Sequence, residues 1–434
     1  MKTLILDGSL AGDTIGSFST ATLQSAITSR GWSAEVIVLR DKKIGNCMGD
    51  FLCWLKSPGK CHIADDNLAI AQKFFESDLV ILLTPITFGG YSSTLKKMVD
   101  HLIQNILPFF TTIDGEIHHE KRYENYPNML TIGWQSQPDE QSDSIFRYLA
   151  WRNAINMYPK VHVCGILYRN QQDKVMKETL NRCLTRVELF ESDVEPSLPK
   201  IQSSSAAPTP VHRALLLVGS PRIQKSTSSS LGSYLFKQLN QHGVETETVY
   251  LYKGLHLPER MEALRHSLDT VDLVVLSFPL YIDTLPAPVI ALLENVIGWC
   301  KEKKTPTRFA AIVNSGFPQP HQNTCAIANC AEFARSAGFE WMGSLELGGG
   351  EGMVHALPLD ELGGRGIPLR RALEIAAGAL ADGQPIPDSA RELFAKPFVP
   401  VWLYKLVGTY NWKKRARQYG AQKLMRARPY QKTL

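Results

Sequence analysis

One pattern occurs twice along these 434 residues: a short apolar run, a loop, and then an amphipathic stretch long enough for a helix. Alternation of this kind predicts βαβ units around a parallel sheet. The fold class is therefore α/β, with two tandem doubly wound domains that each hold a five-stranded parallel sheet flanked by helices. The runs that qualify as strands are Thr3–Asp7, Ala34–Leu39, Leu79–Thr84, Met129–Trp134, Val161–Leu167, Ala214–Val218, Thr246–Leu251, Leu273–Phe278, Phe309–Asn314 and Trp341–Leu347.

A stretch rich in Ser, Pro and Ala separates the two halves. Residues 196–210 read PSLPKIQSSSAAPTP, and almost none of these side chains can contribute to a core, so they are predicted to form a linker. Two domains are also the expected number for this length, because a single core stops growing at about 250–300 residues. We thus expect a first domain at 1–195, a second at 211–399 and a C-terminal tail at 400–434.

The loops that follow equivalent strands in the two halves resemble one another. DGSLAGD follows the first strand of the first half, and VGSPRIQKS follows the first strand of the second. In the same way, LLTPITFGG and LSFPLYIDT follow the two third strands. Similarity at a period of about 210 residues indicates a duplicated domain and excludes a solenoid of short repeats.

Charge and cysteine content argue against several classes of protein. The net charge is +5, but residues 405–432 hold nine Lys or Arg and no acid, so the remainder carries 5 − 9 = −4 and is not a nucleic-acid-binding fold. The eight cysteines are unevenly placed, which does not suit a disulfide framework. No apolar run approaches the roughly 20 residues of a membrane span, and the start does not resemble a secretory signal. We expect a cytoplasmic protein.

Hydroxyl groups and basic residues gather after the first strand of the second half. Residues 219–222 read GSPR, residues 225–230 read KSTSSS, and a helix is predicted from Leu231. A phosphate there would meet hydroxyls, backbone N–H groups and the positive end of the helix dipole. Arg222 or Lys225 would add a charge-assisted contact of about 1.5–3 kcal/mol. The alternative is an ordinary N-cap with a flexible loop, but a cap needs one hydroxyl and not five.

The equivalent loop of the first half, Gly8–Thr20, is a weaker candidate. It holds several hydroxyls, among them that of Ser9, but no basic residue. Asp13 would repel a phosphate unless its carboxylate is turned away. The loops after the third strands, 84–92 and 278–283, combine a proline with an aromatic residue and backbone donors. They suit the edge of a flat ring such as isoalloxazine, or they are simple strand-to-helix turns.

These motifs resemble those of the NAD(P)H-dependent FMN reductase and multimeric-flavodoxin family, within the flavodoxin-like fold. The resemblance is carried by GSPR with a following STS in the second half and by TPITFGGYSSTLKKMVDH in the first. It implies that the loop after the first strand binds the FMN phosphate and that the loop after the third strand lies against the flavin. The implied cofactor contacts of the second half are Ser220, Arg222, Ser226, Thr227, Ser228, Pro279, Leu280 and Tyr281. Those of the first half are Ser9, Pro85, Thr87, Phe88 and Gly89.

The loop after the fourth strand of the second half is a third candidate. It begins Asn314-Ser315-Gly316-Phe317-Pro318, and we expect Ser315 and Gly316 to line the flavin site. His321 lies a few residues further on and is interpreted as a surface or capping residue rather than a proton donor.

A cysteine-rich segment of the first half also resembles part of this family. The segment holds three cysteines, Cys47, Cys53 and Cys61, and Asp50 stands at the position where the family often has a fourth Cys. Iron–sulfur flavoproteins hold a [4Fe–4S] centre with such a cysteine cluster. Because Asp50 breaks the pattern, no metal site is predicted. A structural loop or a redox-active thiol pair is favoured, and a zinc site lacks support from His spacing.

Two further segments carry conspicuous residues. His118-His119-Glu120 lacks a second ligand pair at metal spacing and is interpreted as a solvated loop. The tail interleaves aromatic and basic residues. It is interpreted as a helix that packs its aromatics on a domain. The alternatives are a dimer contact, a grip on an anionic membrane surface, or a gate over a phosphate-bearing substrate.

We therefore expect an FMN-dependent NAD(P)H oxidoreductase that transfers two electrons to a quinone-like, flavin or other small acceptor. No GxGxxG fingerprint follows the first strand, so nicotinamide is expected as a transient substrate. No acid–base pair is expected, because hydride passes directly between nicotinamide and flavin. The chain is expected to form a homo-oligomer or an intramolecular pair of domains. The rivals are a flavodoxin-like scaffold that lacks flavin in one or both halves, and an iron–sulfur electron carrier.

Overall fold

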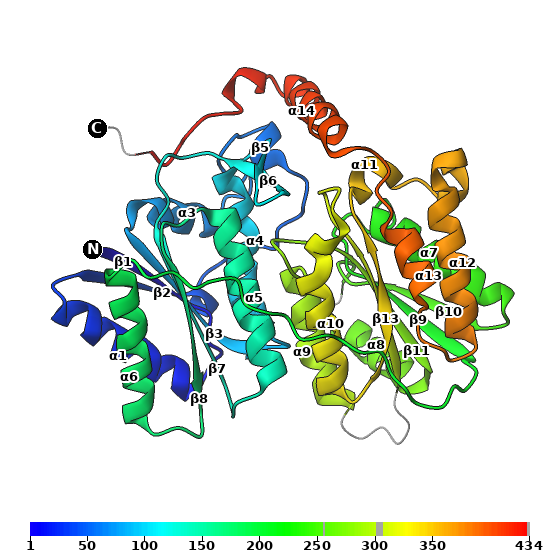
Figure 1. Ribbon diagram of the computed structural model, residues 1–434, viewed down its shortest axis with the longest axis horizontal. Helices are drawn as coiled ribbons and strands as arrows, with labels where there is room; N and C mark the ends of the chain where they lie inside the picture. The colour runs from blue at the N-terminus through cyan, green and yellow to red at the C-terminus, as the bar shows by residue number, and fades with distance from the viewer. Residues whose placement is uncertain (255–256, 301–306, 432–434) are drawn as a thin grey trace. The chain divides into compact units, whose positions relative to one another are not determined.

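The computed structural model describes residues 1–254, 257–300 and 307–431 (Figure 1). The chain separates into two compact units, Met1–Pro199 with Lys405–Leu434 and Lys200–Tyr404. The segment that follows Tyr404 therefore belongs to the first unit. Among the described residues, no helix has both the length and the apolar character that crossing a bilayer requires.

The first unit is built on a parallel sheet with the strand order β2-β1-β3-β7-β8. Its three inner strands, β1, β3 and β7, are mostly buried, which explains why they read as continuous apolar runs. Helices α1 and α6 share a core on one face of the sheet, and α3, α4 and α5 cover the other (Figure 1). The strands are β1 (Lys2–Asp7), β2 (Ser33–Val38), β3 (Leu79–Thr87), β7 (Asn128–Gln135) and β8 (His162–Tyr168), and the helices are α1 (Thr14–Ser29), α2 (Leu52–Leu55), α3 (Asn67–Glu76), α4 (Ser93–Asp100), α5 (Glu140–Met157) and α6 (Asp173–Glu188).

The second unit repeats this topology with the order β10-β9-β11-β12-β13. One of its cores lies where α7, α12 and α13 cover one face of the sheet. The strands are β9 (Arg213–Val218), β10 (Glu245–Tyr250), β11 (Leu273–Pro279), β12 (Arg308–Asn314) and β13 (Glu340–Leu347). The helices are α7 (Thr227–Gln241), α8 (Pro258–Thr270), α9 (Ala287–Cys300), α10 (Thr324–Ala337), α11 (Gly350–Val354), α12 (Ile367–Ala381) and α13 (Asp388–Ala395).

Both halves confirm the predicted flavodoxin-like α/β fold, and all ten predicted runs fall on parallel strands. In each sheet the first strand lies between the second and the third, so the strand order reverses at the first strand. Ligands of open α/β sheets bind outside the carboxyl ends of the strands at such a point. The loops after β1 and β3, and those after β9 and β11, are therefore the places to look for a site.

The interpretation of His118-His119-Glu120 as a solvated loop is wrong. These residues lie in β6 (Glu116–Lys121), which forms an antiparallel hairpin with β5 (Ile106–Ile113). His118 is buried and contacts Asn156 and Glu116, and burial lowers the pKa of His119 to about 3. The turn at Asp114-Gly115 has positive φ at both residues, as a two-residue hairpin turn requires.

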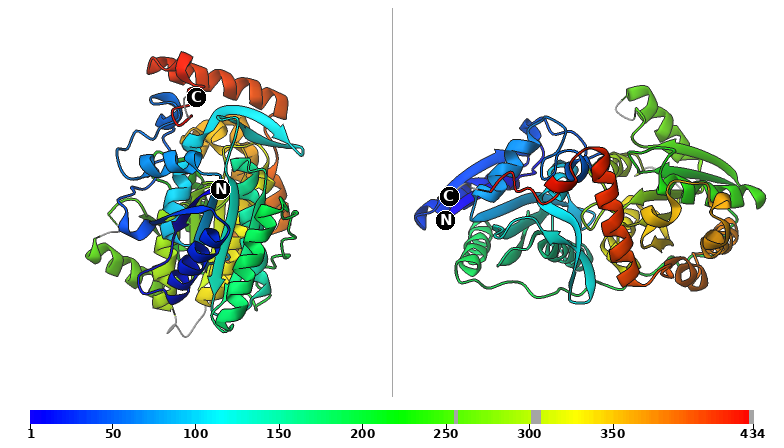
Figure 2. Two further views of the ribbon diagram at one scale, coloured as in Figure 1. Left: turned by 90° about the vertical axis from the view of Figure 1, so that its left-hand side faces the viewer. Right: turned by 90° about the horizontal axis from the view of Figure 1, so that it is seen from above.

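The C-terminal segment packs on this hairpin region of the first unit. Helix α14 (Val401–Gln418) lies beside the β5–β6 hairpin in both views of Figure 2. Gly408 of α14 comes so close to the Phe110 ring that a Cβ atom would stand 2.8 Å from it. Further along, the buried Arg122 donates hydrogen bonds to the carbonyl oxygens of Met425 (3.1 Å) and Ala427 (2.7 Å). Residues far apart in sequence thus share one small core.

Candidate functional site

In the second unit, the loop between β9 and α7 starts at a glycine that the packing requires. A Cβ atom on Gly219 would lie 2.7 Å from Val289 and 3.0 Å from the Cβ atom of Phe278. The Gly219 N–H donates to the carbonyl of Ser277 at 2.8 Å, which holds the loop against β11. The loop therefore leaves the sheet close to its surface and delivers the following residues to the start of α7.

The hydroxyls of this loop divide into two groups. Ser226 caps α7, because its Oγ accepts a hydrogen bond from the Ser229 N–H at 3.1 Å. Ser228 Oγ accepts from the Asn314 amide at 2.8 Å. By contrast, the Ser220 hydroxyl makes no hydrogen bond within the described part of the chain, and Thr227 Oγ1 has only a long one of 3.4 Å to Gly350.

Positive charge and backbone donors accompany these hydroxyls. The N–H groups of Thr227 and Ser228, the first two of α7, find no partner among the described residues, as is usual at a helix N-terminus. Lys225 is exposed and forms no ion pair there. Arg222 instead pairs through both guanidinium nitrogens with Glu351 of α11, with one N–O distance of 2.7 Å. Its contact with a phosphate would therefore have to compete with this carboxylate.

Asn314, at the end of β12, joins three loops. Its side-chain amide donates to Ser228 Oγ and to the backbone carbonyl of Phe278 (3.1 Å). Its backbone carbonyl accepts from the Leu280 N–H (2.8 Å). Through these hydrogen bonds of Asn314, the loops after β9, β11 and β12 are fixed close together, as the sequence predicted for the carboxyl edge. The nearby Arg222 is affected by its own neighbours: its hydrogen bonds with Glu351 raise its pKa, and Tyr281 acts in the same direction.

The remaining predicted residues of the second unit lie in the same group of loops. Pro279 ends β11, and Tyr281 closes a tight turn with Thr284 through a 3.0 Å hydrogen bond. Ser315 turns its hydroxyl toward the carbonyl of Phe317 at 3.2 Å. The carbonyl of Gly316 accepts a hydrogen bond from Tyr404.

The equivalent place in the first unit already contains a carboxylate. Asp13 caps α1 and accepts hydrogen bonds from the N–H groups of Ile15 (3.0 Å) and Gly16 (3.2 Å). The indole N–H of Trp134 donates to its second oxygen at 2.8 Å. The hydroxyl of Ser9 is held by Arg40, also at 2.8 Å. Thus the donors that would bind a phosphate are occupied by side chains of the unit itself.

The loop after β3 also differs from a strand-to-helix turn. Thr87 pairs with Gly90 of β4 (Gly90–Tyr91), and Phe88 and Gly89 form the tip of this small hairpin with positive φ at both residues. Pro85 lies within β3. A side chain at Gly89 would lie 2.7 Å from Ile145, so the tip is packed tightly against α5.

Comparison with known proteins agrees with the occurrence of one domain type twice along the chain. A family model described as NADPH-dependent FMN reductase matches residues 1–160 and 212–330, which together are more than half of the chain. The chain belongs to the NADPH-dependent FMN reductase family. The predicted family and its two tandem copies are thereby confirmed, and FMN is the cofactor that the family description names.

Two curated relatives of this family member are iron–sulfur flavoproteins. That of Methanocaldococcus jannaschii is 42% identical over 76 residues, which are 18% of this chain and 38% of that protein. That of Archaeoglobus fulgidus is 31% identical over 83 residues, which are 19% of this chain and 40% of that protein. The chain thus spans only about two fifths of the length of the curated relatives that it matches.

Two solved structures are also similar to this chain, at lower sequence identity. An FMN-dependent NADH-azoreductase from Bacillus anthracis, in complex with FMN, is 13% identical, covers 39% of this chain and 99% of its own, and gives a TM-score of 0.30. A putative quinone reductase from Klebsiella pneumoniae is 18% identical, with 41% and 87% coverage and a TM-score of 0.30.

The two units of this FMN reductase family member differ in their fit to FMN. In the second unit, the unpartnered N–H groups of α7, the Ser220 hydroxyl and the Lys225 ammonium are a donor set that suits a phosphate dianion. In the first unit, the Asp13 carboxylate accepts from the second and third N–H groups of α1, and two arginines that reach the loop, Arg40 and Arg169, are held by Ser9 and by Asp13 itself. The residues of the second unit fit FMN and those of the first unit do not.

The three cysteines of the first unit lie close enough to influence one another electrostatically. Burial is the main cause that raises the pKa of Cys47 to about 12 and the pKa values of Cys53 and Cys61 above their usual range. Asp50 accepts from the Leu52 N–H at 2.9 Å. In the part of the chain that the structure describes, no three His, Cys, Asp or Glu side chains are placed to hold a metal ion.

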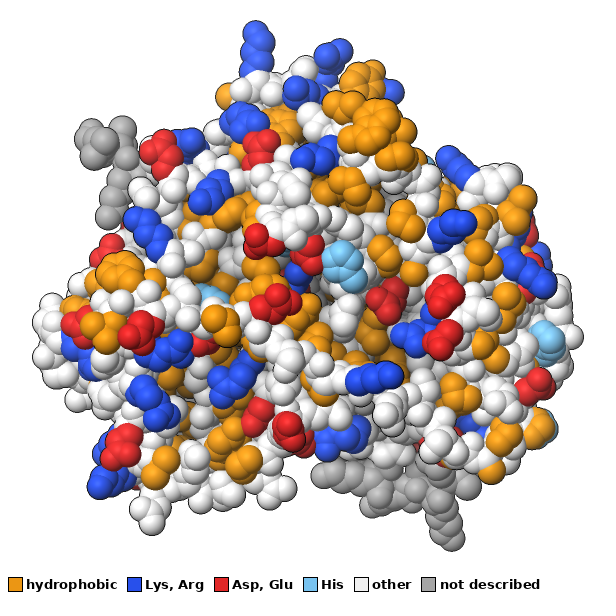
Figure 3. Space-filling view, in the orientation of Figure 1, with side chains coloured by type: hydrophobic (Ala, Val, Ile, Leu, Met, Phe, Trp, Pro, Cys, Tyr) orange, Lys and Arg blue, Asp and Glu red, His pale blue; other side chains and the backbone are white. Residues whose placement is uncertain are grey.

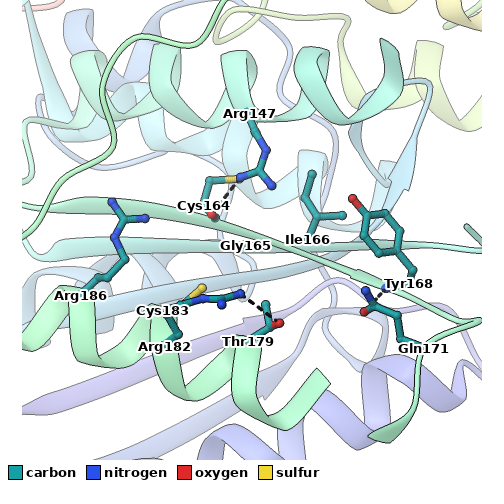
Figure 4. A pocket seen from close by; sticks show the side chains of 10 residues that line it. All are labelled: Arg147, Cys164, Gly165, Ile166, Tyr168, Gln171, Thr179, Arg182, Cys183 and Arg186. Atoms are coloured by element: carbon teal, nitrogen blue, oxygen red, sulfur yellow. Dashed lines mark hydrogen bonds between the residues drawn. The ribbon is translucent and has the colours of Figure 1, made fainter. Parts of the chain in front are cut away.

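A cavity of about 310 Å³ lies at the free edge of β8 (Figure 4). Arg147 stands on one side of the strand and donates to the carbonyl of Cys164 at 3.3 Å, and Asp193 accepts from the N–H of Cys164 at 2.6 Å. Arg186 pairs with Asp193 at 2.7 Å. These charged groups therefore satisfy the open backbone of an edge strand. Sequence reasoning gave no sign of this cavity, because its lining comes from α5, β8 and α6.

Glu346 is a titratable residue that the sequence did not single out. It lies on β13, and burial raises its pKa from 4.5 to about 7, against the opposing effects of Arg391 and His321. Between these two pH values the folded state keeps a proton that the unfolded state has lost. The stability of the second unit should therefore fall as the pH rises through this window and stay lower above it.

Replacing Glu346 by Gln should remove this loss. We expect Glu346→Gln to increase the free energy of unfolding by about 2 kcal/mol near pH ~8 and to leave it unchanged near pH ~4.5. Urea unfolding at both pH values measures the difference. Glu392→Gln, at an exposed position of α13, is the matched control and should show no such pH dependence. A gain for Glu346→Gln that is equal at both pH values would contradict the buried-proton explanation.

Proposed function

We propose that this chain is an FMN-dependent oxidoreductase that takes two electrons from NAD(P)H and passes them to a quinone-like, flavin or other small acceptor. The second unit holds the flavin. NAD(P)H enters as a transient substrate, because the chain has no GxGxxG loop that would retain a dinucleotide. The family membership supports the flavin chemistry.

The observation that carries the proposal is the set of hydrogen bonds that Asn314 makes to the loops around it. By binding Ser228 and the backbone of Phe278 and Leu280, it fixes the phosphate loop and the flavin loop relative to each other. A cofactor with a phosphate at one end and a flat ring at the other needs both contacts at a set separation. A site held in place before binding loses less conformational entropy when the cofactor arrives.

Each group of residues then has a definite role. The N–H groups of Thr227 and Ser228, together with Lys225, bind the phosphate. Pro279, Leu280 and Tyr281 supply an apolar wall for the ring. When bound, FMN supplies the redox chemistry: it accepts a hydride from the nicotinamide and returns two electrons to the acceptor. The protein is left with the tasks of positioning and of excluding water.

The proposal includes a stoichiometry of one flavin per chain. Asp13 already satisfies the N-terminus of α1, so a phosphate in the first unit would meet a fixed negative charge. The first unit would then keep the flavodoxin-like shape without the cofactor.

An absorption spectrum of the purified full chain, with the released chromophore counted per chain after denaturation, tests this function. We expect flavin bands near ~375 and ~450 nm, one FMN per chain, and bleaching by one equivalent of NADH or NADPH without oxygen. Two FMN per chain would overturn the assignment of the first unit. A protein that stays colourless after incubation with FMN would overturn the function and favour the scaffold.

A second candidate function is electron transfer by an iron–sulfur flavoprotein. It is favoured by the names of the two curated relatives and by the proximity of Cys47, Cys53 and Cys61. Four ligands normally hold such a cluster, and Asp50 instead binds the backbone of its own loop. Iron and acid-labile sulfide measured on protein purified without oxygen distinguish the two. Four of each per chain would establish this candidate, and their absence would leave the flavin as the redox centre.

A further inference from the structure

Helix α14 carries more apolar surface than its packing on the first unit uses. Its inner face is accounted for, because Trp412 packs on Phe51 and Trp54, with ring centroids 5.1 and 5.2 Å away, and Ala416 is fully buried. The contact of Gly408 with Phe110 lies on this side as well. A helix held in this way needs only polar residues on its opposite side.

The opposite side of α14 is instead apolar over its first turns. Trp402, Leu406 and Tyr410 are exposed by 63%, 63% and 65%, and Val407 is also exposed. Their spacing of four residues places the first three in one stripe along the helix. Figure 3 shows hydrophobic side chains gathered in this region with Lys and Arg around them. Neighbouring apolar side chains of this size, rimmed by charge, mark an interaction surface.

The same face becomes cationic further along the helix. Lys413, Lys414 and Arg417 follow Tyr410 at helical spacing, are exposed, and form no ion pair within the described residues. Residues 405–434 contain nine Lys or Arg and no acid. Two cations beyond the helix, Arg426 and Arg428, are paired with Glu120 and Glu124. Lys413, Lys414 and Arg417 can therefore meet a negatively charged partner outside the unit.

We propose that this face of α14 docks the chain on an anionic lipid surface. Trp402, Leu406 and Tyr410 enter the boundary between headgroups and acyl chains, where Trp and Tyr are most stable. Lys413, Lys414 and Arg417 meet the anionic headgroups. A second copy of the chain suits this face less well, because a two-fold contact would bring the same cations together. The proposal does not rest on the flavin site.

Vesicle binding by the full chain tests the proposal. Sedimentation with phosphatidylcholine vesicles containing about 30 mol % phosphatidylserine should give at least about ten-fold tighter binding than phosphatidylcholine alone. Raising the salt from ~0.05 to ~0.5 M should weaken that binding by a further factor of about ten, since exposed charges are screened. Equal binding to both vesicle types, or binding to neither, would overturn the proposal.

Matched variants separate the helix from the rest of the surface. Leu406→Ser should weaken binding to the anionic vesicles several-fold, whereas Leu189→Ser, at a site exposed by 61%, should not. The pair Lys413→Gln and Lys414→Gln should weaken it, and Lys160→Gln with Lys200→Gln, the same change in net charge at exposed positions elsewhere, should matter much less. All of these residues are exposed, so circular dichroism should show intact folds. Light scattering that reveals a dimer broken by Leu406→Ser, without vesicle binding, would assign the face to a second copy instead.

Discussion

Replacing Ser226 by Asp should abolish FMN binding by the second unit while leaving α7 folded. Asp is as good an N-cap as Ser, so the helix keeps its first hydrogen bond. The added carboxylate, however, stands at the phosphate site as Asp13 does in the first unit. At about 5 Å and an effective dielectric constant of ~20, two like charges repel by about 3 kcal/mol, so we expect affinity to fall by at least a factor of about 100.

Two controls make this prediction specific to the phosphate. Ser226→Asn retains the cap without the charge and should bind FMN nearly as well as the original protein. Riboflavin lacks the phosphate, so its weaker binding should be the same in Ser226→Asp and Ser226→Asn. Titration of the flavin-free protein, followed by flavin fluorescence, measures all four combinations. Unchanged FMN affinity in Ser226→Asp would place the phosphate away from the start of α7.

Replacing Arg122 by Met should destabilise the first unit by about 3–5 kcal/mol and release the end of the tail. The guanidinium is buried and donates to four carbonyl oxygens, two from residues 104 and 106 and two from Met425 and Ala427. Methionine fills the space but removes the guanidinium donors from all four carbonyls, and of these four, within the described residues, only that of Ile106 keeps another side-chain donor, the Trp54 indole N–H at 3.0 Å. Unfolding in urea gives the loss of free energy, and limited proteolysis within residues 419–431 should become faster.

A neighbouring arginine is the control for this change. Arg426 forms an exposed ion pair with Glu120, and Arg426→Gln should cost less than about 1 kcal/mol. Arg122→Lys keeps the charge but cannot reach four carbonyls, so its stability should fall between those of the original protein and Arg122→Met. If Arg122→Met is no less stable than Arg426→Gln, the carbonyls must find water in its place.

Local patterns were enough to predict the fold. Buried parallel strands such as β3 and β11 consist of apolar residues because both of their faces are covered, so each is visible as an uninterrupted run. The β5–β6 hairpin was missed although Asp114-Gly115 is a typical turn signal. Its strands are interrupted by a proline and by paired histidines, which hide the alternation of a strand.

The site could be predicted only in part, because the partners of its side chains lie far away in sequence. The order of the strands brought the loops after β9, β11 and β12 together as expected. No residue close to Arg222 in the sequence, however, indicates that Arg222 pairs with Glu351, which lies 129 residues later. In the first unit the sequence indicated that Asp13 was unfavourable to phosphate, yet its contact with Trp134 depends on packing across the sheet. Local propensity and residue spacing do not determine which distant side chain becomes the hydrogen-bond partner of a site residue.

The return of the tail to the first unit has a consequence for how the protein is made. The carbonyls that Arg122 binds at Met425 and Ala427 are synthesised about 300 residues after it. At a ribosomal rate of about 5–20 residues per second, this is a delay of roughly 15–60 s. During that time the second unit emerges and can fold, whereas in the first unit one guanidinium nitrogen of Arg122 still lacks its two carbonyl acceptors. The unit that begins first is therefore the one completed last.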